Sequence, residues 1–145
     1  MVCDMITTTS EDFGPAQLEQ ATKTLASMHE ASTTSIVGDE LLERGYAHVH
    51  KVERAASAER QPRLVHLVWK QNGAGENGAL PKVVLVGKGD CYDTEGLSLK
   101  PTSGMITMKK DMGGAAHVLS LAYMIMDAEL RVQLPVFMSA VEKNG

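Results

Sequence analysis

Two lysines and two aspartates lie close together between residues 88 and 111. Lys88, Asp93 and Lys100 fall in the glycine-punctuated stretch GKGDCYDTEGLSLKPTSG (87–104), and Asp111 comes just before a pair of glycines. Carboxylates that converge repel one another unless a cation lies between them, and a hard divalent metal ion supplies that charge. The spacing is compatible with a metal site, but a single Lys or Asp in a loop is more often solvated surface.

These charged residues follow a predicted strand and precede a predicted helix. The apolar run KVVLV (82–86) predicts a strand that is buried on both faces. From Met112, the stretch MGGAAHVLSLAYMIMDAEL predicts a buried helix whose small first-turn residues let it approach other backbone closely. Ligands gather at the carboxyl ends of strands in α/β sheets. We therefore expect the two acids and two lysines to converge over one strand end and one helix start.

Two further helices are predicted nearer the start of the chain. The stretch EDFGPAQLEQATKTLASMHEA predicts a helix with Asp12 as its cap and Pro15 in its first turn. The stretch GDELLERG (38–45) predicts a short helix that Gly45 closes.

Further strands are predicted at 33–37, 63–69 and 131–141. Pro135 argues that the last of these is an edge strand, a bulged strand, or a shorter strand that starts after the proline. Residues 70–81 are predicted to form a loop that joins two adjacent strands. The alternation of helices and strands predicts an α/β fold, with a mostly parallel sheet flanked by helices.

Composition argues against several classes of protein. The 145 residues, 43% hydrophobic and 22% charged, suit one folded domain, and the net charge of −4 gives no basic field for nucleic acid. No apolar run reaches the roughly 20 residues that a membrane helix needs, and the start lacks the features of a signal peptide. Cys3 and Cys91 are expected to be free thiols in a reducing compartment. We expect a cytoplasmic protein without a membrane or nucleic-acid partner.

The stretch VVLVGKGDCYDTEGLSLKPTSGMITMKKDMGGAAHVL (83–119) resembles the signature of the leucyl aminopeptidases, also called cytosol aminopeptidases. Their pattern runs V-G-K-G-x-x-[FY]-D-[ST]-G-G-x-x-x-K-P, and then M-x-x-M-[KR]-x-D-M-G-G-A-A. The stretch DMITTTSEDFGPAQLEQ resembles the opening of their catalytic domain more loosely, so the resemblance covers nearly all of the chain. It implies the first half of a zinc-exopeptidase-like catalytic domain.

The resemblance implies a role for each charged residue of the cluster. Lys88 would bind metal through a neutral amine, Asp93 would bridge two metal ions, and Asp111 would ligate the tighter one. Lys100 would stay protonated and stabilise the oxyanion of the reaction. The family's two divalent ions, zinc or manganese, activate a water and hold the free amino group of a peptide substrate. The implied reaction removes N-terminal, leucine-like residues, and the implied assembly is a homo-oligomer, a hexamer in the family.

The sequence also departs from the family pattern. Glu95 replaces the first of two paired glycines, and Asp90 stands where an apolar residue is usual. The family's second motif, N-T-D-A-E-G-R, which completes both metal sites, is not found in the sequence. We therefore expect residues 1–145 to form a partial catalytic domain, without the amino-terminal domain or the carboxyl-terminal half, and with at most one partial metal site.

Three functional hypotheses remain open from the sequence. The first is a metal-dependent leucyl aminopeptidase whose chain is weak or inactive alone. The second is a non-catalytic paralogue that acts as a binding or regulatory partner of a full-length aminopeptidase. The third is a non-functional remnant of such an enzyme.

Overall fold

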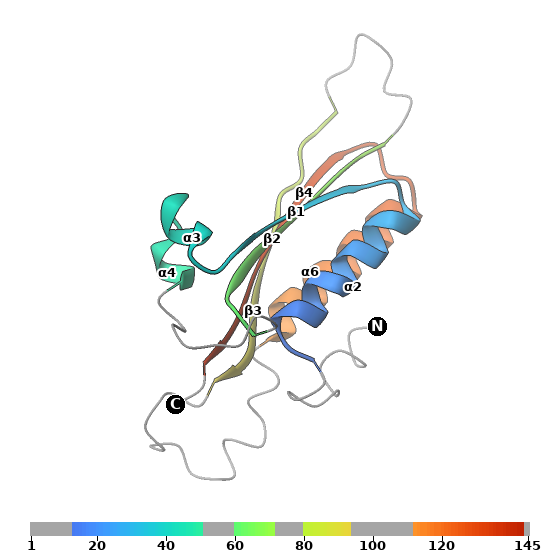
Figure 1. Ribbon diagram of the computed structural model, residues 1–145. Helices are drawn as coiled ribbons and strands as arrows, with labels where there is room; N and C mark the ends of the chain where they lie inside the picture. The colour runs from blue at the N-terminus through green and yellow to red at the C-terminus, as the bar shows by residue number, and fades with distance from the viewer. Residues whose placement is uncertain (1–12, 51–59, 72–79, 94–111, 144–145) are drawn as a thin grey trace.

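The computed structural model describes residues 13–50, 60–71, 80–93 and 112–143. Four strands form one sheet in the order β1-β2-β4-β3. Helices α2 and α6 lie together on one side of this sheet, and the short α3 and α4 lie on the other side (Figure 1). The elements in chain order are α2 (Pro15–Met28), β1 (Ser32–Val37), α3 (Glu40–Glu43), α4 (Ala47–His50), β2 (Arg63–Lys70), β3 (Leu85–Asp93), α6 (Gly113–Asp127) and β4 (Gln133–Lys143).

The α/β class is confirmed, but the prediction of a mostly parallel sheet is wrong. The sheet is mixed, because β1 and β4 both run antiparallel to β2, and only β3 and β4 run parallel. A parallel pair needs a long crossover, and α6 supplies it between β3 and β4. Between β1 and β2 the described helices, α3 and α4, have only four residues each, which is too short to carry the chain back along β1.

The connection between β2 and β3 also differs from its prediction. Residues 70–81 were expected to join adjacent strands, but β4 lies between β2 and β3 in the sheet. The strand predicted at 82–86 begins instead at Leu85 and continues to Asp93. Lys88 therefore lies inside a strand rather than in a loop beyond one.

The two long helices follow the sequence more closely. Helix α2 has Pro15 in its first turn as predicted, but its cap is Gly14 rather than Asp12, and the N–H of Gly14 donates to Gln17 Oε1 at 3.0 Å. Gly45, at φ +84°, follows α3 as expected. Helix α6 buries one side on the sheet, but Leu121 and Met124 on its other side are 44% and 63% exposed, so the prediction of a buried helix is wrong for that side. The core between the helices and the sheet includes Leu18, Leu25, Val65, Leu67, Leu119, Met126, Leu134, Val136 and Met138.

Pro135 does not mark an edge strand, because β4 is central in the sheet. Pro135 lies opposite Val68 of β2, while the register of β3 against β4 begins one residue later, at Val136. On the same side, Lys82 forms a parallel bridge with Gln133, so Pro135 lies at a break in this ladder, where its missing N–H is tolerated.

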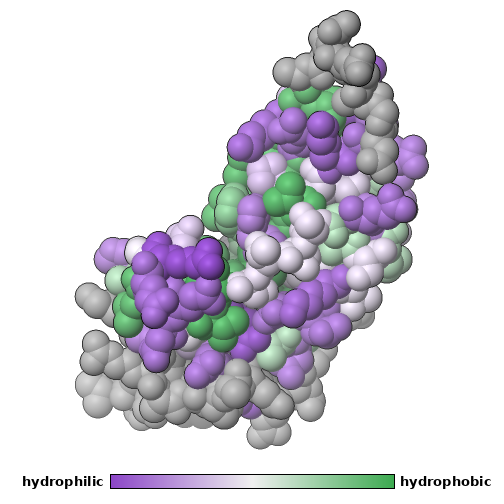
Figure 2. All heavy atoms as spheres, turned by 45° about the horizontal axis from the view of Figure 1, so that its top comes forward, coloured by the Kyte–Doolittle hydropathy of each residue, from purple (hydrophilic) through white to green (hydrophobic). Residues whose placement is uncertain are grey.

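The two faces of the sheet are covered unequally. Val65 and Leu67, on the side of α2 and α6, are fully buried, whereas Val84 and Val86 on the other side are 50% and 73% exposed. The prediction that the apolar run at 82–86 is buried on both faces is therefore wrong for the described residues. Hydrophilic side chains gather over the block at the left of Figure 2, where Figure 1 places α3 and α4. In the described part of the chain, no helix is long and apolar enough to cross a membrane.

Candidate metal centre

Strand β3 and helix α6 meet at Lys88 through three glycines. A Cβ added to Gly87 would lie 2.8 Å from Ala115 Cα, and one added to Gly89 would lie 2.7 Å from a backbone oxygen of β4. A Cβ added to Gly114 would lie 3.0 Å from both the N and the O of Lys88. The prediction that small residues let the first turn of α6 approach other backbone closely is confirmed.

The side chain of Lys88 points away from this helix contact. Successive side chains of a strand alternate between faces, so Lys88 and Asp90 share the face opposite Gly87 and Gly89. Lys88 Nζ lies 3.2 Å from Asp90 Oδ2, and the Lys88 side chain is 59% exposed. This ion pair requires the ammonium form of Lys88, whereas ligation of a metal requires the neutral amine.

A β-bulge lies between Lys88 and Asp93. In the parallel register Lys88 is opposite Ser139 and Asp93 is opposite Lys143, with an irregularity between Asp90 and Tyr92. Positions 88 and 93 are five apart on β3, but positions 139 and 143 are four apart on β4. The extra residue reverses the alternation, so the backbone positions of Lys88 and Asp93 fall on the same face of the sheet.

The other two predicted residues, Lys100 and Asp111, lie outside the described residues, as does the side chain of Asp93. Of the segment that carries Lys100 and Asp111, the structure describes only the two elements on either side. The chain leaves β3 at Asp93 and enters α6 at Gly113, and these elements are in contact at Lys88. Within the described ranges, no group of three or more His, Cys, Asp or Glu side chains could hold a metal ion. The assignment of Lys88, Asp93, Asp111 and Lys100 therefore stays a prediction.

A buried ion-pair network near the same end of the sheet was not predicted. Glu19 of α2 accepts from Arg63 of β2 and from Lys23, each at 2.6 Å, and Arg60 pairs with the buried Glu142 of β4. Burial alone would raise the pKa of Glu19, but the hydrogen bonds from Lys23 and Arg63 lower it below its usual value. In the sequence, only the i, i+4 spacing of Glu19 and Lys23 signals this network.

Cys91 lies on the covered side of β3 and is 2% exposed. Its thiol is free, as expected, while Cys3 lies outside the described residues. Burial, together with the negative charges of Glu142 and Asp90, raises the pKa of Cys91 to about 12. A thiol of this kind stays protonated at neutral pH and is suited to packing rather than to nucleophilic or metal chemistry.

Comparisons with known proteins agree with the resemblance found in the sequence. A family described as "Cytosol aminopeptidase family, catalytic domain" matches residues 1–144. The crystal structure of a cytosol aminopeptidase from Coxiella burnetii superposes with a TM-score of 0.87 at 44% identity, over 99% of this chain and 29% of that one. Peptidase B of Pectobacterium carotovorum is 42% identical over 120 residues, which are 79% of this chain and 26% of that protein.

A third match is more distant and contains a metal. The structure of the bottromycin maturation enzyme BotP in complex with Mn has a TM-score of 0.83 at 27% identity, over 98% of this chain and 29% of that one. The chain belongs to the cytosol aminopeptidase family. It spans between about a quarter and a third of the length of the relatives that it matches.

Proposed function

We propose that this chain supplies part of the metal centre of an aminopeptidase, at the carboxyl end of β3. Lys88, Asp93 and Asp111 are the proposed metal ligands, and Lys100 is the proposed catalytic cation. The supporting observation is the close packing of Gly114 on the backbone of Lys88, where an added Cβ would lie 3.0 Å from the Lys88 N and O. Helix α6 therefore begins beside Lys88, while β3 continues for five more residues to Asp93 before the connecting segment starts.

The chemistry of these donors suits a divalent ion. Two carboxylates and an amine are acceptable ligands for zinc or manganese, and the related enzyme BotP was solved with Mn. A bound ion would supply Lewis acidity for attack on a peptide carbonyl. Lys88 would first have to lose its proton and give up its ion pair with Asp90, and Lys100 would have to keep its proton to stabilise the oxyanion.

The proposed reaction is the removal of leucine-like residues from the amino terminus of peptides. The name of the family supports this reaction and a cytoplasmic location. Relatives use more chain than this one spans, so we propose that this chain alone holds one ion at a partial site and turns over weakly or not at all. The second ion that the family resemblance implies is proposed only for a complete site, and assembly into a homo-oligomer belongs to the same proposal.

Calorimetric titration of the chain with manganese tests the metal centre. We expect one site whose affinity falls by roughly tenfold or more in the variant Lys88→Ala, in line with the usual loss when support of a metal is removed. Lys82→Ala, at an exposed lysine ahead of β3, is the control and should bind as the unchanged chain does. Affinity should rise with pH, because Lys88 must release a proton. Equal binding by both variants would rule out Lys88 as a ligand.

The role of Lys100 requires a separate measurement. Lys100→Ala should keep the manganese affinity but lose any metal-dependent hydrolysis of leucine p-nitroanilide, because a group that stabilises the oxyanion acts only in the transition state. If Lys100→Ala lost metal binding as well, Lys100 would have to be reassigned from catalysis to the metal site.

The exposed apolar side of the sheet favours a second candidate function. Val84 and Val86 are 50% and 73% exposed there, and apolar side chains that gather on a sheet face often mark a contact surface. The alternative is a non-catalytic chain that binds a full-length aminopeptidase through this face. Co-purification with such an enzyme that is lost in Val86→Lys would support it, and co-purification that survives Val86→Lys would exclude this face as the contact.

A further inference from the structure

Strand β1 forms an open edge of the sheet in the described part of the chain. Its six residues, Ser32–Val37, pair with β2 in an unbroken antiparallel register, and among the described strands β2 is its only neighbour. In Figure 1, α2 lies on one side of the sheet and α3 and α4 on the other, so neither layer extends the sheet beyond β1. None of the six residues is buried. An edge of this kind presents N–H and C=O groups that can pair with another chain.

The hydrogen bonds beside β1 show which of its residues direct their backbone groups outward. The register continues to Gly38, whose N–H donates to the carbonyl of Pro62 at 2.9 Å. Hydrogen-bonded and non-hydrogen-bonded pairs alternate along an antiparallel ladder, so the even-numbered residues of β1 bond to β2. The backbone groups of Thr33, Ser35 and Val37 therefore face away from β2.

The position of Pro135 supports this assignment independently. Val68 of β2 lies opposite Ser32 on one side and opposite Pro135 on the other, and Ser32 Oγ donates to the Val68 carbonyl at 3.4 Å. With the backbone groups of Val68 directed to β1, Pro135 costs the ladder between β2 and β4 no hydrogen bond. In the opposite arrangement, Pro135 would leave the Val68 carbonyl without its donor.

The other edge of the described sheet has features that discourage pairing, and β1 does not. Strand β3 has a bulge between Asp90 and Tyr92, and it carries the ion pair of Lys88 and Asp90. Charged side chains and bulges are common protections of an edge strand against a second chain. The sequence of β1, STTSIV, has no charged residue and no proline, and its register has no bulge. Strand β1 is therefore the less protected edge.

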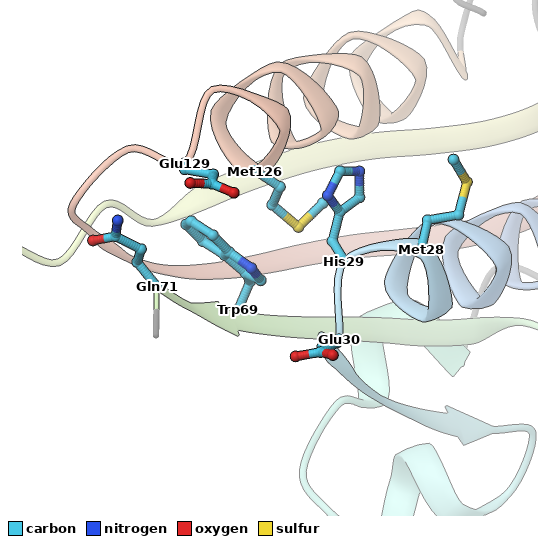
Figure 3. A pocket seen from close by; sticks show the side chains of 7 residues that line it. All are labelled: Met28, His29, Glu30, Trp69, Gln71, Met126 and Glu129. Atoms are coloured by element: carbon cyan, nitrogen blue, oxygen red, sulfur yellow. The ribbon is translucent and has the colours of Figure 1, made fainter. Parts of the chain in front are cut away.

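The chain on either side of β1 limits the length of this edge. Met28 and Glu30, between the end of α2 and the start of β1, line with Trp69 a cavity of about 440 Å³ where α2, α6 and β2 end (Figure 3). At the other end Gly38, with φ of 58°, turns the chain toward α3. A partner strand can therefore pair along six residues, or about 20 Å.

The edge of β1 is complementary to itself. In an antiparallel pair about a two-fold axis at Ser35, Ser35 lies opposite Ser35 of a second copy, and Thr33 lies opposite Val37. Each of these pairs exchanges two backbone hydrogen bonds, about six in all. Between them Thr34 lies opposite Ile36, on the face of the sheet away from α2. No charged side chain of β1 comes opposite another, because the strand has none.

We propose that two copies of this chain associate through β1, as an antiparallel pair that joins their sheets into one. A second copy supplies a strand of matching length, free edge and side chains at the concentration of the chain itself. The contact is small and consists mainly of backbone hydrogen bonds, so the dimer is reversible, with a dissociation constant in the micromolar range. It does not use the proposed metal centre and does not depend on the aminopeptidase proposal.

Sedimentation velocity over a series of concentrations measures this association. The sedimentation coefficient of the unchanged chain should rise with concentration toward that of a dimer. Ser35→Pro removes the central outward N–H and keeps the bonds to β2, as prolines in edge strands do, and should weaken the dimer by roughly tenfold or more. Ser35→Ala keeps this N–H and is the matched control. A chain that stays monomeric, or equal association of both variants when circular dichroism shows both to be folded, would overturn the proposal.

Disulfide cross-linking tests the register and does not require the proline variant to fold. Thr34 and Ile36 of facing copies form a non-hydrogen-bonded pair, with Cα atoms about 4.5 Å apart, within reach of a disulfide. The same residues of the two copies are diagonal neighbours, about 7–8 Å apart. In a Cys3→Ser background, in which Cys91 is 2% exposed, a mixture of Thr34→Cys and Ile36→Cys chains should cross-link faster on mild oxidation than either chain alone. No cross-linking in the mixture, or faster cross-linking of Thr34→Cys alone, would refute this pairing.

Discussion

The two faces of the nine-residue strand β3 differ in their burial and in the residues that they carry. On one face Gly87, Gly89 and Cys91 press against helix α6 and the core, with no room for a larger side chain at either glycine. On the other face Val86 and Lys88 are 73% and 59% exposed. The contrast shows that the VGKG sequence is not a loop signal here. Its glycines are packing residues, and the residues between them are presented outward.

The largest difference between the faces should appear in thiol reactivity. The pKa of Cys91 is raised from 9.0 to about 12, so the thiolate fraction at pH 8 should be about a thousandfold lower than that of an ordinary cysteine. In a Cys3→Ser background, iodoacetamide should leave Cys91 unmodified in the folded chain. The thiol introduced on the other face by Val86→Cys should react rapidly. Mass spectrometry over time measures both, and fast labelling of Cys91 would contradict the burial of this face.

The next effect concerns the ion pair that joins α2 to the covered face. Glu19→Gln leaves Arg63, whose side chain is 7% exposed, without its carboxylate, and should lower the free energy of unfolding by roughly 3 kcal/mol. Glu43→Gln, at an exposed acid of α3, should change it by less than about 0.5 kcal/mol. Urea unfolding measures both changes. If the two variants lost equal stability, the ion pair between Glu19 and Arg63 would not stabilise the fold.

The same residue predicts how stability depends on pH. The folded pKa of Glu19 lies below its ordinary value of 4.5, so its contribution is complete above about pH 4.5 and is lost as the pH falls through the lower, folded value. The free energy of unfolding should therefore fall with acidification in this range, and less steeply in Glu19→Gln. Parallel curves for the two proteins would assign the acid sensitivity to other carboxyl groups.

A smaller effect is expected from one added methyl group on the covered face and from the exchange of a methyl group for a hydroxyl on the exposed face. Gly89→Ala would place its Cβ 2.7 Å from the carbonyl oxygen of Ser139, so β3 and β4 must shift, at a cost of about 1–3 kcal/mol. On the exposed face Val86→Thr should cost less than about 0.5 kcal/mol. Thermal unfolding followed by circular dichroism distinguishes them. Similar costs would mean that Val86 is covered in solution, for example by a second chain.

Local patterns in the sequence predicted the elements that local physics determines. The apolar spacing of α2, the presence of a helix at α6, and the β-rich runs at β1 and β2 agree with the sequence predictions, whereas the burial of α6 on all sides does not. The sheet order was not predicted, because the insertion of β4 between β2 and β3 is set by contacts distant in sequence. The run KVVLV gave no sign that one of its faces lacks a covering helix among the described residues.

The candidate sites also differ in how far the sequence alone predicts them. Lys88 and the small residues of α6 could be found from the family pattern, and the close approach of Gly114 to Lys88 agrees with that reading. The cavity that Trp69 lines at the ends of α2, α6 and β2 could not be predicted, because residues far apart in the sequence form it.

The bulge in β3 makes the distance between two residues along the chain as important as their identity. Five steps separate Lys88 from Asp93, an odd number that would put them on opposite sides of a regular strand. The extra residue of the bulge compensates for this odd number, so the two positions share a face only while the bulge is kept. Deleting that residue would leave four steps and the same face in a regular strand, whereas straightening the bulge without a deletion would put the two positions on opposite faces.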